Sequence, residues 1–233
     1  MESKQFLRLV LFDIDGTLIS TNGIAKETFG VSMDAVFGSR SASRDHDFAG
    51  KTDPQIYREV CEKSGIDPEL ALAKKDDVFS KFFALLEQRL TQDRITVLPG
   101  VHDLLGELDT IESATTALMT GNMLQGARIK LTPPDLLKYF GFGAFGNDAE
   151  DRSKLPEIAV SRAYERTGAT FRAKEIVVIG DTPHDINCGK HLNVRTIAVA
   201  TGIFKAEQLA QHQPDHLFRD FTDTNAVLDA ILS

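Results

Sequence analysis

The chain has 233 residues, of which 42% are hydrophobic and 26% are charged, a balance typical of a folded globular protein rather than a disordered one. Its formal net charge of -8 argues against a nucleic-acid-binding protein, which usually presents a basic face. No apolar run approaches the length of a membrane span, and the short N-terminal run stops at Asp13 without the features of a signal peptide. Cys61 and Cys188 lack metal-ligand spacing and are expected to be reduced thiols, so we predict a cytoplasmic protein.

Five short apolar segments are predicted to be strands. In chain order they cover residues 6–12, 115–119, 140–146, 175–179 and 195–199, and the third is the weakest because of its glycines. Helical patterns separate the later strands. This alternation predicts an α/β fold with a doubly wound, mostly parallel, Rossmann-like sheet that carries helices on both faces.

About a hundred residues without a good strand separate the first two predicted strands. One helical pattern begins at Asp53, predicted as its N-cap, is followed by Pro54 and stops at Gly65. A second, within residues 68–92, places its large apolar side chains on one face, which favours packing between helices. We therefore predict a helical cap subdomain, residues 21–94, inserted into a core domain made of residues 1–20 and 95–233.

Polar residues follow the ends of three predicted strands. Asp13 and Asp15 follow the first strand, and Thr120 follows the second. Asp181 follows the strand at 175–179, with Asp185 one helical turn later. Ligands of open α/β sheets bind outside the carboxyl ends of the strands, so we expect these side chains to meet at one site.

Phosphoryl transfer through a carboxylate nucleophile would use such a set of residues, because an aspartate can form an aspartyl-phosphate intermediate. Crowded carboxylates would repel a phosphate, so we expect Mg2+ between them, bound by Asp13, Asp181 and the backbone carbonyl of Asp15. Gly16 allows the chain to leave strand geometry, so that Asp15 can address the same site as a general acid and base. Backbone N–H groups after Asp13 and at residues 120–121 can hold the phosphate oxygens.

The segments "DIDGT", "LMTGN" and "GDTPHD" occur in this order, and together they resemble the motifs of the haloacid dehalogenase (HAD) superfamily of phosphohydrolases. The resemblance covers the entire chain and implies a HAD-like core. It implies that Asp13 is the nucleophile and Asp15 the acid/base, and that the Thr120 hydroxyl binds phosphate. It also implies that Asp181 is a metal-binding carboxylate and that Asp185 supports it.

The third motif of this family is a lysine between the second and fourth motifs, and the resemblance assigns it to Lys154 in "DRSKLPEIA". Many relatives have a proline directly after this lysine, whereas here Leu155 precedes Pro156. Lys138 and Lys130 match the motif less well.

The inserted segment resembles the helical cap of the phosphoglycolate phosphatase-like and β-phosphoglucomutase-like branch, through "FAGKTDPQI" at residues 48–56. This resemblance implies that Lys51 reaches a second charged group of the substrate when the cap closes and excludes water. The alternative is that Lys51 is a solvated residue beside a helix start. The predicted substrate-binding residues are Gly16, Gly121, Asn122 and Lys51.

The function that the resemblance implies is a Mg2+-dependent phosphomonoester hydrolase acting on a small phosphorylated metabolite, phosphoglycolate-like by analogy with the branch. Two alternatives stay open, a phosphosugar mutase of the same branch and a non-catalytic module that binds a phosphorylated ligand. Access of water to the aspartyl-phosphate separates hydrolase from mutase, and no motif reports it. The sequence makes no prediction of the oligomeric state.

Overall fold

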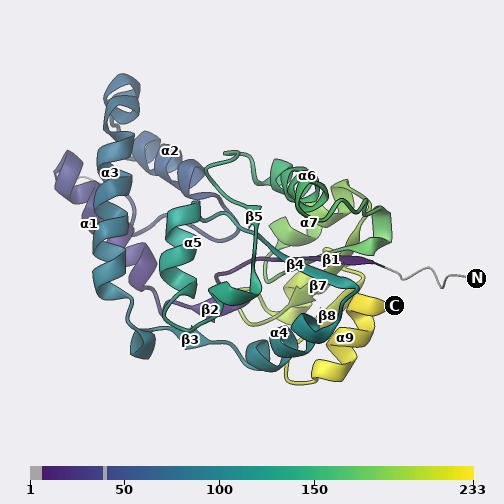
Figure 1. Cartoon of the computed structure of the whole chain (residues 1–233). Coiled ribbons are helices and arrows are strands. Elements are labelled where there is room, and N and C mark those ends of the chain that lie inside the picture. Colours follow the sequence, from purple (N-terminus) through teal and green to yellow (C-terminus); the bar gives the residue numbers. More distant parts are fainter. Residues whose placement is uncertain (1–6, 39–40) are drawn as a thin grey trace, which may run out of the picture.

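The computed structural model describes residues 7–38 and 41–233 of the chain. A parallel sheet is covered on both faces by helices, and three further helices lie to one side of it (Figure 1). The six strands of the sheet are all parallel to their neighbours. Their spatial order is β5 (Gly143–Ala144), β4 (Ala114–Met119), β1 (Arg8–Phe12), β6 (Ile176–Gly180), β7 (Arg195–Val199) and β8 (His216–Phe218). The predicted α/β fold class is confirmed.

The predicted strands differ from the observed ones mainly at the sheet edges. The first was predicted to begin at residue 6, which lies outside the described residues, and the glycine-containing segment at 140–146 contributes only the two residues of β5. The strand β8 was not predicted, because its three residues are all only partly buried and produce no apolar run. Two further short strands, β2 (Ile19–Ser20) and β3 (Thr96–Val97), form a separate antiparallel ribbon.

Helices fill the segments between the strands. The three helices beside the sheet are α1 (Ile24–Phe37), α2 (Asp53–Lys63) and α3 (Pro68–Arg89). The others are α4 (Val101–Thr110), α5 (Leu124–Leu131), α6 (Leu155–Thr167), α7 (Pro183–His191), α8 (Ala206–Ala210) and α9 (Thr224–Leu232). Short 3-10 turns occupy Gln92–Arg94, Leu137–Tyr139, Arg152–Lys154 and Ala173–Glu175.

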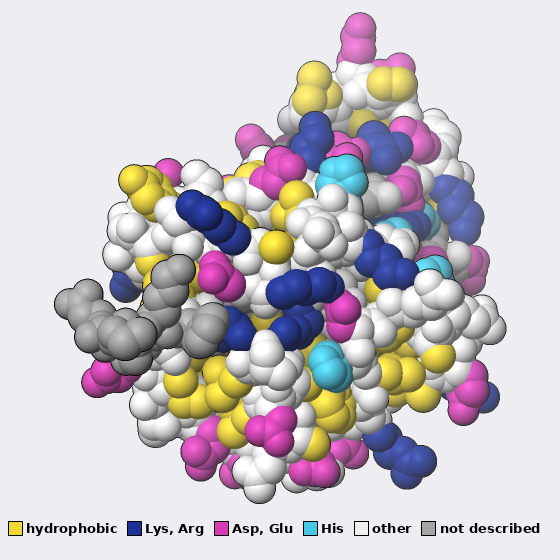
Figure 2. Space-filling model, turned by 90° about the vertical axis from the view of Figure 1, so that its right-hand side faces the viewer, with side chains coloured by type: hydrophobic (Ala, Val, Ile, Leu, Met, Phe, Trp, Pro, Cys, Tyr) yellow, Lys and Arg dark blue, Asp and Glu magenta, His cyan; other side chains and the backbone are white. Residues whose placement is uncertain are grey.

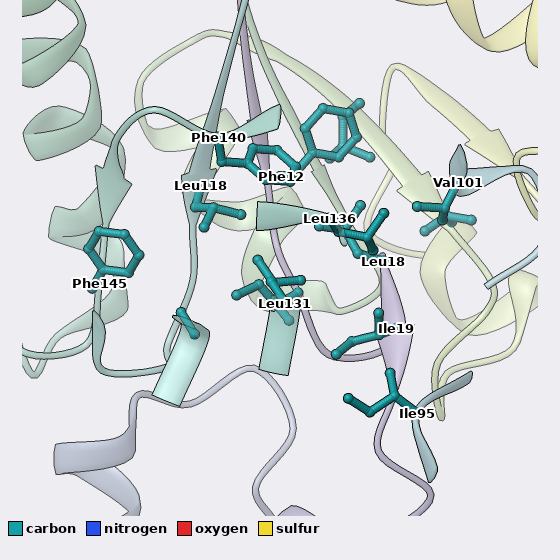
Figure 3. Close-up of a cluster of buried hydrophobic side chains, with 14 of the residues drawn as sticks. Phe12, Leu18, Ile19, Ile95, Val101, Leu118, Leu131, Leu136, Phe140 and Phe145 are labelled. Atoms are coloured by element: carbon teal, nitrogen blue, oxygen red, sulfur yellow. The ribbon is translucent and has the colours of Figure 1, made fainter. Parts of the chain in front are cut away.

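The central strand β1 is buried on both of its faces. Val10 and Phe12 belong to the hydrophobic cluster that includes residues of α4 and α9. Leu9 and Leu11 belong to a second cluster, which includes residues of α6. Figure 3 shows part of the first cluster, in which Phe12, Leu118 and Phe140 lie close together. Burial on both faces explains why the sequence of β1 is continuously apolar instead of alternating.

The ribbon β2–β3 joins the core to the helical insertion. Ile19 pairs with Val97, and Ser20 pairs with Thr96, so both connections between the two parts run side by side. The predicted division at residues 20/21 and 94/95 stays a prediction, and this ribbon lies at both predicted junctions. Helix α2 begins one residue earlier than predicted, because Thr52 is its N-cap and Asp53 is its first residue.

The insertion has a hydrophobic interior of its own. The predicted packing of apolar side chains between helices is observed, since Phe29 of α1 meets Phe82 of α3 with ring centroids 5.7 Å apart. The phenol of Tyr57 on α2 packs against Phe79, and its hydroxyl donates to the carbonyl of Ala71. Aromatic contacts therefore connect all three helices.

The surface mixes charges of both signs. On the face drawn in Figure 2, Lys and Arg side chains gather near the centre, with Asp and Glu side chains close around them. Among the described residues, no helix combines the length and the apolar character needed to cross a membrane.

Gly100, where the chain returns to the core, allows a test of this packing. Its φ is +79°, and a Cβ there would lie 2.1 Å from the backbone carbon of Phe221, so Gly100→Ala should lower the free energy of unfolding by about 2 kcal/mol or more. Gly106 lies inside α4 with open space around it, and Gly106→Ala should raise stability by up to about 1 kcal/mol. Urea denaturation of both variants measures the difference, and equal stabilities would contradict this view of the junction.

Candidate active site

The first two predicted site residues follow β1 directly. The backbone N–H of Asp13 donates to the carbonyl of Ile179 on β6, so Asp13 continues the sheet, and the residue is only 5% exposed. Gly16 has a φ of +81°, and a Cβ there would lie 2.3 Å from a carboxylate oxygen of Asp181. Glycine is therefore required at this position both for its conformation and for the close approach of Asp181.

Two more carboxylates, those of Asp181 and Asp185, follow the end of β6, and Asp185 also takes part in the N-terminal cap of α7. Thr182 is the N-cap of α7, and its hydroxyl donates to Asp185 Oδ2 at 2.6 Å. Asp181, just before this cap, accepts a hydrogen bond from the Thr17 hydroxyl at 3.1 Å. The capping box fixes Asp185 to the start of α7, so this motif has a structural role together with any chemical one.

Three of the four predicted metal residues come together. Carboxylate oxygens of Asp13, Asp181 and Asp185 all lie within 4.8 Å of one another, and all three residues are buried. Burial raises the pKa of Asp13 to about 6, although the Arg152 guanidinium opposes the shift. Burial also raises the pKa of Asp181, with the neighbouring carboxylates of Asp13 and Asp185 adding to the effect. The prediction for the fourth, Asp15, concerns its backbone carbonyl, and its carboxylate is not in this cluster.

An arginine lies where the third motif was expected. Arg152 is in the 3-10 turn before α6 and is 5% exposed. Its Nη2 lies 3.1 Å from Asp13 Oδ1 and 2.5 Å from Asp185 Oδ1. Lys154, predicted for this place, is exposed and does not line the cavity described below. Both residues belong to the same 3-10 turn, and of the two only Arg152 lines the cavity and contacts Asp13.

Thr120 and Asn122 meet Asp15 through a network of hydrogen bonds. The Asn122 side-chain amide donates to Asp15 Oδ2 at 2.7 Å and to the Thr120 hydroxyl at 2.8 Å. The ammonium of Lys130 lies 2.6 Å from Asp15 Oδ2 and 2.6 Å from Asn122 Oδ1. Asn122, predicted to bind substrate, thus contacts the predicted acid/base directly. Lys130 is a member of this group that the sequence analysis placed only as a weak alternative to Lys154.

A cavity of about 500 Å³ lies between the core and the helical insertion. The predicted residues that line it are Asp13, Asp15, Gly16, Lys51, Thr120, Gly121, Asn122 and Asp181. Arg152 and Lys130 line it as well, whereas Asp185 and Lys154 do not. Residues from three strand ends therefore surround one space, as the position of ligands in open α/β sheets predicts.

The side of the cavity formed by the insertion carries two lysines. Lys51 forms an ion pair with Glu59 at 2.7 Å, and His46 Nε2 lies 3.1 Å from the same carboxylate oxygen. Lys26 donates to the carbonyl of His46 at 2.7 Å and lies over the ring of Phe48. Lys51 is consequently neither fully solvated nor free of a partner.

The insertion rests directly on the loop at residues 120–123. Asp53 N–H donates to the Gly121 carbonyl at 2.8 Å, and Met123 N–H donates to Asp53 Oδ2 at 2.7 Å. A Cβ at Gly121 would lie 2.1 Å from the carbonyl oxygen of Lys51. The start of α2 and the Thr120-containing loop are therefore in close backbone contact.

Comparison with known proteins agrees with this architecture. The model of the haloacid dehalogenase-like hydrolase family matches residues 10–199. The chain belongs to this family. The predicted resemblance is confirmed, and so is the predicted class of enzyme, a HAD-type hydrolase with phosphatases among its relatives.

Individual relatives are similar over nearly their whole length. Pyrophosphatase PpaX of Listeria welshimeri is 30% identical over 224 residues, which cover 94% of this chain and 95% of the relative. PpaX of Bacillus pumilus is 28% identical and covers 98% of this chain and 99% of the relative. A predicted phosphoglycolate phosphatase from Haemophilus somnus has a TM-score of 0.74 at 17% identity, and the match covers 97% of this chain and 100% of that one. A putative β-phosphoglucomutase from Thermotoga maritima has a TM-score of 0.63 at 19% identity, with the same coverage. These two structures share the fold.

The contact of Asp53 with the core loop predicts a pH dependence of stability. Burial raises the pKa of Asp53 to about 6 from 3.8, so the folded chain holds this proton more tightly than the unfolded chain. The stability that Asp53 contributes is then greatest below pH 4 and falls as the pH rises toward 6. Asp53→Asn, which keeps an acceptor for Met123 N–H, should gain up to about 2 kcal/mol relative to the unmodified chain between pH 4 and 7.

Thermal unfolding at several pH values tests this expectation. Asp76→Asn, at an exposed position of α3, is the matched control and should follow the unmodified chain at every pH. A constant difference between Asp53→Asn and the unmodified chain across this range would contradict the assignment.

Proposed function

We propose that the chain is a Mg2+-dependent phosphomonoester hydrolase that acts on a small phosphorylated metabolite through an aspartyl-phosphate at Asp13. The observation that carries the proposal is the position of the Asp13 carboxylate, which lines the cavity and lies against Arg152 and within the three-carboxylate cluster. A nucleophilic carboxylate needs to be ionised, oriented and close to positive charge. Asp13 meets the last two needs through Arg152.

The donor set fits Mg2+, which prefers carboxylate and other oxygen ligands. Three ionised carboxylates and one guanidinium leave two negative charges in a buried place, and a divalent cation balances them. Asp13 and Asp181 would hold the ion, with the carbonyl of Asp15 as a further ligand and Asp185 in support. When bound, the ion would offset the negative charge of the substrate's phosphoryl oxygens.

The side chains of the chain itself would carry the transfer. Asp13 attacks phosphorus as the bond to the leaving oxygen breaks, and Asp15 gives its proton to that oxygen. Asp15 then takes a proton from water, which attacks phosphorus and releases inorganic phosphate and free Asp13. The Thr120 hydroxyl oxygen accepts from Asn122, so its own hydrogen is available to a phosphoryl oxygen.

The substrate we propose is small and carries a second anionic group. Lys26 and Lys51 line the part of the cavity formed by the insertion, opposite the core carboxylates. The names of the relatives supply two small candidates with a second anionic group: 2-phosphoglycolate, a phosphomonoester, from the structural neighbour, and pyrophosphate, a phosphoanhydride open to the same attack by Asp13, from the PpaX proteins. We place the reaction in the cytoplasm, in keeping with two buried cysteines that form no disulfide.

Release of inorganic phosphate from a panel of small substrates tests the function. The panel contains pyrophosphate, 2-phosphoglycolate and several sugar phosphates, each with Mg2+ and with a chelator. We expect chelator-sensitive release that falls by at least about 10³-fold in Asp13→Asn, because the nucleophile is lost. Full activity of Asp13→Asn would exclude the mechanism. Isomerisation of a sugar phosphate without phosphate release would favour the mutase, and tight binding without turnover would favour the binding module.

A second prediction separates Arg152 from Lys154. Arg152→Lys retains a cation but replaces the planar guanidinium, whose Nη2 contacts both Asp13 and Asp185, with an ammonium of different reach and geometry, so kcat should fall by about 10²-fold or more. Lys154→Met should change kcat by less than about twofold, since that side chain is exposed away from the cavity. Steady-state kinetics on the preferred substrate measure both, and circular dichroism confirms that each variant is folded. A large loss in Lys154→Met alone would restore the original motif assignment.

A further inference from the structure

Lys130 is a buried cation with an unusual pair of neighbours. Its side chain is 6% exposed, whereas that of its carboxylate partner Asp15 is 41% exposed. Both residues line the cavity. Lysine is seldom buried this deeply unless it is paired, so the ion pair with Asp15 accounts for its presence.

Stability alone does not explain this pair. Burying an ammonium costs several kcal/mol in solvation, and an apolar side chain of similar volume is often equally stable at such a position. Helix α5 already presents Ala127 and Leu131 to the core on this side, and both are buried. A methionine would continue that apolar face without the cost of burying a charge.

The hydrogen bonds of the group hold one particular oxygen of Asp15. Lys130 Nζ and Asn122 Nδ2 both lie close to Asp15 Oδ2, at 2.6 and 2.7 Å. Lys130 also lies 2.6 Å from Asn122 Oδ1, so the three side chains form a closed triangle. Asp15 Oδ1 accepts no hydrogen bond from the described part of the chain. The carboxylate therefore has one oxygen fixed by two donors and the other available.

Lys130 does not take the role expected of the third-motif lysine. That role places a cation on the nucleophile, and in the structure Arg152 contacts Asp13. The ion pair of Lys130 is with the acid/base residue. The site thus holds two buried cations, one at each of the two aspartates that follow β1.

We propose that Lys130 is a positioning residue that, together with Asn122, holds Asp15 by Oδ2 so that Oδ1 is presented to the leaving oxygen and later to the attacking water. This inference rests on the proposed function, since it concerns the proton transfers of that reaction. A misplacement of about 1 Å in a catalytic group can cost about 10²-fold in rate, so loss of the ammonium should affect the steps that need Asp15.

The test uses two phosphate esters that differ in their need for an acid. p-Nitrophenyl phosphate releases a good leaving group that needs little protonation, whereas an alkyl phosphate needs a proton from Asp15. The kinetic quantity is kcat/KM, because it reports only the steps up to departure of the leaving group. In Lys130→Met we expect kcat/KM to fall by about 10–100-fold for the alkyl phosphate and by less than about threefold for the nitrophenyl ester.

Two further measurements follow from the same idea. The second half of the reaction needs Asp15 as a base whichever ester is used, so Lys130→Met should show a burst of p-nitrophenol and a lowered kcat. The double variant Lys130→Met/Asp15→Asn should match Asp15→Asn alone on the alkyl ester, because a positioning residue has nothing left to position. Lys138→Met is the matched control, since Lys138 is 54% exposed and pairs with Asp135 outside the cavity.

The outcomes separate this inference from the function on which it rests. Equal losses of kcat/KM on both esters, or no loss on either, would overturn the role of Lys130 while the activity of the unmodified chain stands. Absence of Mg2+-dependent activity in the unmodified chain would overturn the proposed function and the inference with it. If Lys130→Met does not fold, Lys130→Gln decides by the same ratio of kcat/KM values.

Discussion

A guanidinium buried at the carboxyl end of the central strands holds the candidate active site together. Asp13, Asp181 and Asp185 come from two neighbouring strand ends and are all buried, so their charges repel one another in a place that water solvates poorly. Arg152 contacts two of the three and is itself almost fully buried. Removing one partner of such a group leaves an uncompensated buried charge, which typically costs about 3–5 kcal/mol. The turn before α6 therefore stabilises the acids at this end of the sheet by bringing the arginine back to them.

The same few residues determine both local structure and chemistry. Asp185 closes the capping box of α7, and the opposite oxygen of its carboxylate contacts Arg152. Gly16 turns the chain away from strand geometry after β1, and the Asp181 carboxylate occupies the space where a side chain at position 16 would lie. The turn conformations at the strand ends and the positions of the carboxylates thus depend on each other. A substitution at any of these positions would change both the turn conformation and the positions of the carboxylates.

Most of the sheet could be predicted from the sequence, because strands buried on both faces appear as continuous apolar runs. Edge strands could not: β8 is partly exposed, and β5 has only two residues. The convergence of Asp13, Thr120 and Asp181 also followed from the sequence, since parallel strands have their carboxyl ends at one edge. Within a 3-10 turn, however, residues two apart point in different directions. A motif fitted by spacing therefore selected Lys154, and the folded turn presents Arg152 to the site.

Lys130 shows a different limit of sequence analysis. Its position eight residues after Asn122 matches no short motif, and a lone lysine on a helix is usually solvated. One signal was available, because Lys130 lies between Ala127 and Leu131 on the apolar side of α5. A charge within an apolar helix face indicates a buried partner, but the partner, Asp15, is 115 positions away in the chain. Only the fold connects the two.

The close approach at Gly121 bears on how the helical insertion could be exchanged with that of a relative. Gly121 must lack a side chain, because the backbone carbonyl of Lys51, in the helical insertion, occupies that space. The loop at residues 51–53 and the loop at residues 121–123 therefore fit each other closely. A chimera that combines this core with the helical insertion of a relative would need a matching loop at residues 50–53. Transplanting residues 120–123 together with the insertion should preserve the fit.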